Sequence, residues 1–318
     1  MGGADLPNKE KTGIIIWRFI YPILIFVGVE MVIEMVLLYG YMFSLMKANH
    51  LSISDVGALT DELNNYVYSI SLYITIARSA VLVPVYIVLM RKDKGRDMYY
   101  QRYVKYEPLE YKWLFVLPIL GFVAAMAFNH LVPMILTALQ SFIHVAGKTL
   151  FGSDWNVDFF ATYESLSGTI YSGNIWVQIL ATAIAAPIVE ELLFRGMIFK
   201  RMRSYLKFVP SALVSALVFG VMHGNAVQFL YAFLIGIMLA FIYEKFKIII
   251  APIIFHTGAN LICVIVTMVM PEEGIGLTTG AYMLLVVVEL AVTFLLLWLI
   301  DAKVNRKAVS QDEETGGR

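Results

Sequence analysis

The chain has 318 residues, of which 59% are apolar and only 15% are charged, and its mean hydropathy is +0.74. Lysine plus arginine and aspartate plus glutamate number 24 each, so the net charge favours no class of partner. This composition excludes a soluble globular domain and indicates an integral membrane protein, with the lipid bilayer as its surroundings.

The single cysteine, Cys263, has no intrachain partner, which excludes a disulfide framework and a zinc site built on cysteines. The first apolar run begins at Ile14 and is too long for the core of a signal peptide. We therefore expect this run to remain in the protein as a membrane anchor.

Eight apolar runs are long enough to cross or nearly cross a bilayer. They are residues 14–46, 66–90, 112–146, 174–200, 209–224, 226–245, 248–270 and 281–302. The sequence therefore predicts an all-α, polytopic membrane helix bundle with about eight transmembrane helices. We expect one transmembrane domain over 1–302 and a disordered cytoplasmic tail over 303–318.

The distribution of basic residues predicts the orientation of the bundle. The segments 91–112 and 200–207 are rich in lysine and arginine, whereas 48–65, 150–173 and 271–280 contain neither. Cytoplasmic loops carry the excess of lysine and arginine in membrane proteins. With eight spans, both termini are therefore expected in the cytoplasm.

Three ionisable residues lie near the middle of the first two runs. Glu30 and Glu34 share one helix face, and Arg78 lies at a similar depth on the next, antiparallel helix. We interpret them as a neutralising ion pair, with a proton or cation path as the functional alternative. His130 and His144 are interpreted as buried or interfacial histidines, and Glu289 is left without an assigned partner.

Two adjacent glutamates in the fourth run need a stronger explanation. One carboxylate at the centre of a spanning helix costs about 2.5–3.5 kcal/mol on insertion scales. Glu191 and Arg195 are four residues apart and are predicted to pair. Glu190 points about 100° away from Glu191 and has no partner in this motif.

Later helices carry polar residues that complement Glu190. His223 follows Phe219 by four residues, and Asn260 follows His256 by four. A carboxylate, an imidazole and donors for an oxyanion are the groups that hydrolysis of a peptide bond requires. The chain contains no HExxH helix, no GxSxG turn, no glycine-rich phosphate loop and no basic nucleic-acid stripe.

These residues form three motifs in a fixed order: Glu190 to Arg195 reads EExxxR, Phe219 to His223 reads FxxxH, and His256 to Asn260 reads HxxxN. The set resembles the CPBP family, which contains the type II CAAX prenyl endopeptidases and the bacteriocin-processing, or Abi, membrane proteins. The resemblance covers a core of about residues 174–265.

The resemblance implies a glutamate-dependent intramembrane peptidase whose cavity opens to the cytoplasm. Glu190 would be the general base acting on a water with His223, and His256 and Asn260 would hold the oxyanion. Glu191, Arg195 and Phe219 would give structural support. The family is also described as metalloproteases, so Glu190, His223 and His256 are alternative ligands for a divalent metal such as zinc. We expect a mechanism without a metal or other cofactor.

The expected partner is a peptide or protein substrate, either prenylated or a bacteriocin-like leader peptide. The expected location of the protein is a bacterial plasma membrane. Two alternatives stay open. One is a non-proteolytic membrane scaffold or bacteriocin self-immunity protein. The other is an ion-coupled transporter that uses Glu30, Glu34, Arg78 and Glu289.

Helical rise predicts one geometric difficulty for the site. At ~1.5 Å per residue, His223 lies about 20 Å along its helix, whereas His256 lies only about 12 Å into its own. We expect a turn at Gly224 and Asn225, within the bundle, to bring His223 to the depth of Glu190.

Overall fold

The computed structural model describes residues 12–49, 60–93, 109–164, 174–269 and 276–316, and these contain helices but no strand. The long helices are α1 (Thr12–Asn49), α2 (Thr60–Asp93), α4 (Trp113–Phe151), α10 (Ala226–Phe246), α11 (Ile250–Val269) and α12 (Thr279–Gly316). The remaining apolar helix, α9 (Phe208–Val221), is shorter.

The fourth predicted span is one continuous helical rod made of five pieces. They are α6 (Ile175–Gln178), η2 (Ile179–Ala185), α7 (Ala186–Leu193), η3 (Phe194–Phe199) and α8 (Lys200–Arg203). The η pieces are π-helical, with wider turns than an α-helix, and they flank the piece that carries both glutamates. Such π-helical turns are frequent at functional sites.

Within the described residues, seven helices are long and apolar enough to cross a membrane, and α9 has 14 residues. At ~1.5 Å per residue α9 measures about 21 Å, less than the ~30 Å of a hydrocarbon core. The predictions of an all-α fold and of a multi-pass membrane protein are confirmed. The predicted division into a domain over 1–302 with a core at 174–265 stays a prediction.

The end of the chain differs from its prediction. The residues from 303 were expected to form a disordered tail, but α12 continues without a break to Gly316. Between Lys303 and Gly316 there is neither proline nor glycine. Because alanine, lysine, arginine, glutamine and glutamate all favour helix, a helix that leaves the membrane here has nothing to end it.

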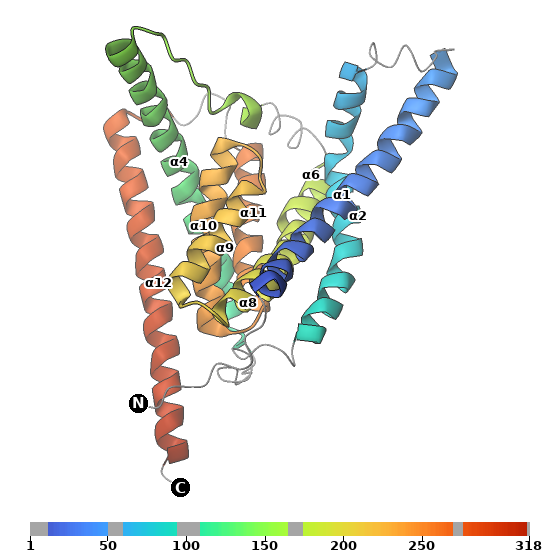
Figure 1. Cartoon of the computed structure of the whole chain (residues 1–318). Helices are drawn as coiled ribbons and strands as arrows, with labels where there is room; N and C mark the ends of the chain where they lie inside the picture. The colour runs from blue at the N-terminus through green and yellow to red at the C-terminus, as the bar shows by residue number, and fades with distance from the viewer. Residues whose placement is uncertain (1–11, 50–59, 94–108, 165–173, 270–275, 317–318) are drawn as a thin grey trace.

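Figure 1 shows α4 beside α12 on one flank, α1 beside α2 on the other, and α9, α10 and α11 between them.

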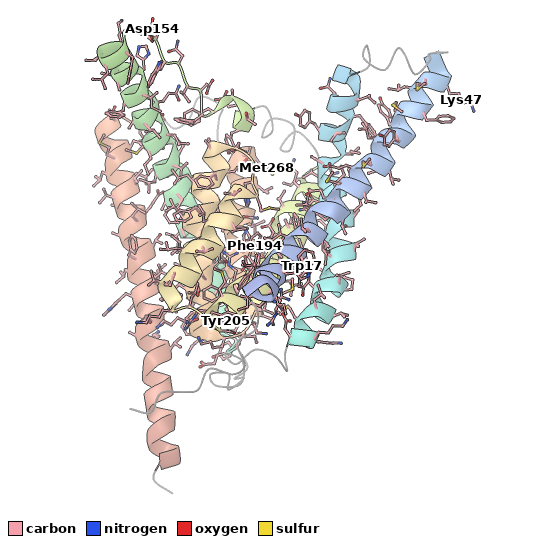
Figure 2. The ribbon with its side chains drawn as sticks, in the orientation of Figure 1. Trp17, Lys47, Asp154, Phe194, Tyr205 and Met268 are labelled. Atoms are coloured by element: carbon pink, nitrogen blue, oxygen red, sulfur yellow. The ribbon has the colours of Figure 1, made fainter. Side chains whose placement is uncertain are left out.

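Arg201 of α8 contacts Asp93 at the end of α2 and Tyr21 near the start of α1. Lys245 of α10 pairs with Asp301 of α12. These contacts gather the basic segments at one end, which we call the basic end. Figure 2 labels Tyr205 at this end, and Lys47, Asp154 and Met268 at the opposite end, which we call the far end.

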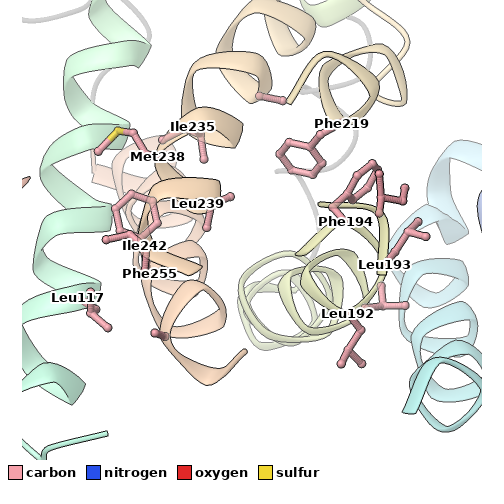
Figure 3. Packing of buried hydrophobic residues seen from close by; sticks show 14 of the residues in the cluster. Leu117, Leu192, Leu193, Phe194, Phe219, Ile235, Met238, Leu239, Ile242 and Phe255 are labelled. Carbon is pink, nitrogen blue, oxygen red and sulfur yellow. The ribbon is translucent and has the colours of Figure 1, made fainter. Parts of the chain in front are cut away.

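The core lies where α7, η3, α9, α10 and α11 meet (Figure 3). Close approach of α4 to α11 depends on two glycines. A Cβ on Gly258 would collide with the backbone of Pro118, and one on Gly121 with the backbone of Phe255. Small residues of this kind allow membrane helices to approach closely.

Two pairs of ionisable residues join helices inside the spans. Arg78 bonds to Glu30, so the predicted ion pair between the first two helices is confirmed. Glu289, to which the sequence assigned no partner, lies 2.8 Å from Nδ1 of His130 and joins α12 to α4. Pairing of this kind lowers the cost of holding charge inside a membrane.

Candidate active site

The candidate residues come from three places in the fold. Glu190 and Glu191 lie on α7, and His256 and Asn260 lie on α11, which packs against it. His223 lies in the short turn between α9 and α10. Residues about 70 positions apart in the chain thus contact one another inside the bundle.

The imidazole of His256 lies between the two adjacent carboxylates. Its Nδ1 is 2.9 Å from Oε1 of Glu191, and its Nε2 is 3.8 Å from Oε2 of Glu190. A carboxylate only accepts hydrogen bonds, so Nδ1 carries a proton and donates it to Glu191. Nε2 therefore faces Glu190.

Glu191 also forms the predicted ion pair with Arg195. Nη1 of Arg195 donates to the same Oε1 at 2.9 Å, and both side chains are completely buried. Nη2 of Arg195 donates to the carbonyl of Gly236 on α10, and the guanidinium carbon lies 4.8 Å from the centre of the Phe219 ring. The pair is confirmed, and it anchors α7 to its neighbours.

His223 returns to the bundle through the predicted turn. Helix α9 ends at Val221 and α10 begins at Ala226, with Gly224 at φ +76° and Asn225 capping α10 by accepting from the Gln228 amide. Nδ1 of His223 lies 2.8 Å from the carbonyl oxygen of Phe219. A carbonyl only accepts, so Nδ1 carries the proton and Nε2 has a free lone pair.

Phe219 connects the two candidate histidines. Its ring meets that of His223 edge to face at 4.9 Å and that of His256 at 5.8 Å. Edge-to-face contacts of this kind hold ring planes in fixed orientations. Phe219 therefore lies between the two imidazoles, and its predicted structural role stays a prediction. The described contact of Glu190 is with His256, not with His223.

Asn260 is held by a residue that sequence reasoning missed. Its Nδ2 donates to the carbonyl of Thr182 at 2.8 Å, and Thr182 lies in the π-helical piece η2. A π-helical turn alters the hydrogen-bond ladder of the helix and makes room for an outside donor. No pattern in residues 179–185 signals this turn.

A partly open cavity of about 430 Å³ is lined by two of the four candidates, His223 and Asn260. Glu190 and His256 are not part of its lining. The rest of the lining is apolar, aromatic or neutral, with a single further histidine: Met126, Asn129, His130, Val132, Pro133, Phe160, Tyr163, Thr182, Val227, Gln228, Tyr231, Cys263, Val266 and Thr267.

The three alternative zinc ligands, Glu190, His223 and His256, do not converge on one point in this arrangement. Across the part of the chain that the structure describes, no group of three histidine, cysteine, aspartate or glutamate side chains is placed to hold a metal ion. Glu190 and His256 are neighbours, but His223 does not join them. The residues in this arrangement do not fit a zinc site, so no step is assigned to a metal.

Known proteins match the same part of the chain. Residues 172–262 match a family model described as type II CAAX prenyl endopeptidase Rce1-like. A Bacillus subtilis protein described as "Putative membrane peptidase YdiL" is 33% identical over 89 residues, which cover 28% of this chain and 36% of that protein. The match thus spans about a third of the relative's length. No solved structure matches the chain.

Residues 172–262 thus match the family predicted from EExxxR, FxxxH and HxxxN, and the comparisons support a membrane protease in general terms. The catalytic roles of Glu190, His223, His256 and Asn260 stay a prediction.

Proposed function

We propose, from the membership of residues 172–262 in the family of type II CAAX endopeptidases, that this protein is an intramembrane endopeptidase. Glu190, His223, His256 and Asn260 are the catalytic residues of the proposal. The observation that carries it is the position of His256 between Glu190 and Glu191, within the matched segment.

The charges around His256 support this assignment. Two carboxylates, Glu190 and Glu191, lie beside one permanent cation, Arg195. An imidazole of His256 that carries a proton on both nitrogens balances the net charge of these three groups. His256 then presents an Nε2–H, a donor suited to an oxyanion.

The hydrogen bond of His223 supports a different role. With its Nδ1–H given to the Phe219 carbonyl, the ring keeps a basic Nε2 on the wall of the cavity. A neutral imidazole in this tautomer accepts a proton from water and helps a carboxylate to activate it.

The proposed reaction adds one water across one peptide bond. Glu190, assisted by His223, takes a proton from water, and the oxygen attacks the carbonyl carbon. Nε2 of His256 and Nδ2 of Asn260 donate to the oxyanion. Glu190 then gives the proton to the amide nitrogen as the C–N bond breaks, which leaves one carboxyl group and one amine.

The substrate of the proposal is a membrane-associated peptide or protein. A prenylated protein and a bacteriocin-type leader peptide are the two kinds that the family suggests. In this proposal the protein crosses the plasma membrane several times, and both of its termini face the cytoplasm.

Cleavage of a peptide library by the purified protein in liposomes, with and without chelator, tests the proposal. We expect cleavage that Glu190→Gln slows by about 10²–10⁴ and that Glu34→Gln, a change to another intramembrane glutamate, leaves intact. Full cleavage by Glu190→Gln contradicts the proposed role of Glu190. Substrate flux that vanishes with Glu34→Gln but survives Glu190→Gln selects a transporter instead.

A further inference from the structure

One wall of the cavity carries an imidazole that the proposed reaction does not use. His130 lies on α4 and lines the cavity together with His223 and Asn260. It lies outside residues 172–262, so the match to the family gives it no role. The sequence alone indicated a buried or interfacial histidine. Its contacts with α12, which lies beside α4 (Figure 1), indicate a more specific role.

Glu289 of α12 fixes the orientation of this imidazole. Its Oε2 lies 2.8 Å from Nδ1 of His130, and both side chains are mostly buried. A carboxylate only accepts hydrogen bonds, so Nδ1 carries a proton and donates it to Glu289. Tyr282 of α12 packs edge to face against the ring at 5.5 Å, and its hydroxyl donates to the His130 carbonyl. Helix α12 thus holds the ring and the backbone of His130, and Nε2 remains for another partner.

The charge of Glu289 determines which partner suits Nε2. An imidazole of His130 that carries a proton on both nitrogens balances this carboxylate, and its Nε2–H is then a hydrogen-bond donor. The described residues that line the cavity include no lysine, arginine, aspartate or glutamate. A carboxylate bound at Nε2 would therefore keep an uncompensated charge, which is costly away from water. A neutral acceptor such as a peptide carbonyl carries no such cost.

Gln228 provides a second donor from the first turn of α10. Its Oε1 accepts from Nδ2 of Asn225 at 2.6 Å, and its backbone amide donates to Oδ1 of the same asparagine at 2.9 Å. These bonds leave the Nε2 amide group of Gln228 as a donor. Gln228 lines the same cavity as His130. The cavity therefore has two donors on side chains that neighbouring residues hold in place.

A peptide inside a helix bundle needs donors of this kind. The backbone groups of a membrane helix are bonded within the helix, so they offer little to a bound chain. The carbonyl groups of an extended peptide lose free energy when they leave water without a new partner. Side chains on the cavity wall are the groups that can replace the water.

We propose that His130 and Gln228 form a binding subsite for a peptide backbone, in which their Nε2 groups donate to carbonyl oxygens beside the peptide bond that is cut. The proposal rests on the proposed peptidase function for naming this peptide as the substrate. Glu289 is a positioning residue that acts through His130. Because the subsite binds backbone rather than side chains, it accepts uncharged segments of varied sequence.

Occupancy of the cavity is measured with Cys263, which is the only cysteine of the chain and lines the cavity. A bound peptide that covers Cys263 slows its reaction with N-ethylmaleimide, which is read from the mass of the intact protein. The probes are acetylated and amidated heptapeptides of uncharged residues. They are added to the purified Glu190→Gln protein in detergent, so that cleavage of the probe is slowed. The dependence of the labelling rate on peptide concentration gives an apparent Kd.

Replacement of His130 by phenylalanine removes the donor and keeps an aromatic ring. We expect the apparent Kd to rise about three- to tenfold, the usual effect of one hydrogen bond. Gln228→Leu is expected to give a rise of the same size. His144→Phe is the matched control, because His144 lies on the same helix but lines a different cavity, and it is expected to leave the apparent Kd unchanged.

Replacement of Glu289 by glutamine separates binding from mere support of the fold. Glutamine keeps the size of the side chain and still accepts from Nδ1, but it removes the charge that balances a doubly protonated His130. We expect the same rise in the apparent Kd as for His130→Phe, with little change in melting temperature. The double variant is expected to bind as His130→Phe does, because Glu289 acts through His130. Unchanged binding by Glu289→Gln overturns the positioning role.

An altered probe identifies the acceptor. In a set of peptides, each peptide bond in turn is replaced by an E-alkene, which keeps the shape but lacks the carbonyl. At one position we expect weaker binding to the parent protein and no further loss with His130→Phe. Losses that add in full to that of His130→Phe at every position overturn the assigned acceptor.

Two further results overturn the subsite itself. One is that no peptide protects Cys263, and the other is an equal apparent Kd in His130→Phe and in the parent protein. Cleavage of a peptide library by the unaltered protein is measured separately. Protection of Cys263 without any cleavage contradicts the peptidase function alone. Cleavage with an unchanged KM in His130→Phe contradicts the subsite alone.

Discussion

His256 and Glu191 are joined by a hydrogen bond of 2.9 Å between Nδ1 and Oε1, deep inside the bundle. This bond fixes which imidazole nitrogen faces Glu190. Glu191 is therefore more than a partner for Arg195, because it also positions His256.

Replacement of Glu190 by glutamine removes the proposed base but keeps its size. We expect kcat to fall by about 10²–10⁴, the usual contribution of a general base, with little change in the melting temperature. The measurement is peptide cleavage in liposomes together with thermal unfolding in detergent. Glu34→Gln is the control, and equal losses in the two variants contradict a catalytic role for Glu190.

Replacement of Glu191 by leucine leaves Arg195 buried without its carboxylate. We expect a loss of about 3–5 kcal/mol in the free energy of unfolding, the range measured when one partner of a buried pair is removed. The double variant Glu191→Leu with Arg195→Met recovers much of that stability, because no uncompensated charge remains. Equal stability of the single and double variants argues against the pair.

Replacement of Asn260 by leucine removes a proposed donor to the oxyanion. We expect kcat to fall by about 10²–10³ while KM changes little. Thr267→Val, a change elsewhere in the same cavity lining, is expected to leave kcat near that of the original protein. A purely structural role for Asn260 predicts instead that melting temperature and kcat fall together, since the Thr182 carbonyl loses its donor.

Replacement of Gly258 by alanine places a methyl group against the backbone of Pro118. We expect α4 and α11 to be pushed apart, at a cost of about 1–3 kcal/mol in the free energy of unfolding. Gly28→Ala in α1 is the control, because its new Cβ meets no atom within 4 Å. Since alanine favours helix over glycine, that control is expected to be neutral or slightly stabilising.

The sequence predicted the features that depend on local pattern. Apolar runs of helical length located the helices, and the four-residue spacing of Glu191 and Arg195 predicted their ion pair. Gly224 and Asn225 predicted the turn that carries His223, since only glycine readily adopts a positive φ. Each of these signals lies within a few residues of the feature that it predicts.

Features that depend on packing were not predicted. The bond from His256 to Glu191 joins residues 65 positions apart, and nothing in either motif assigns one of the two glutamates to it. The pairing of His130 with Glu289 depends on where α12 lies against α4. The position of the cavity requires knowing which helix ends come together, which spacing along one helix does not reveal.

The π-helical piece η2 links the length of the fourth span to the direction in which Glu190 points. A π-helical turn holds about one residue more than an α-helical turn, so this piece sets the rotation of α7 about the helix axis. If residues 179–185 formed α-helix at unchanged length, the two glutamates would turn away from α11 without a change to any side chain of the EExxxR motif. The rotation of this helix about its own axis is set before the motif begins. The site therefore requires this rotation as much as it requires the motif itself.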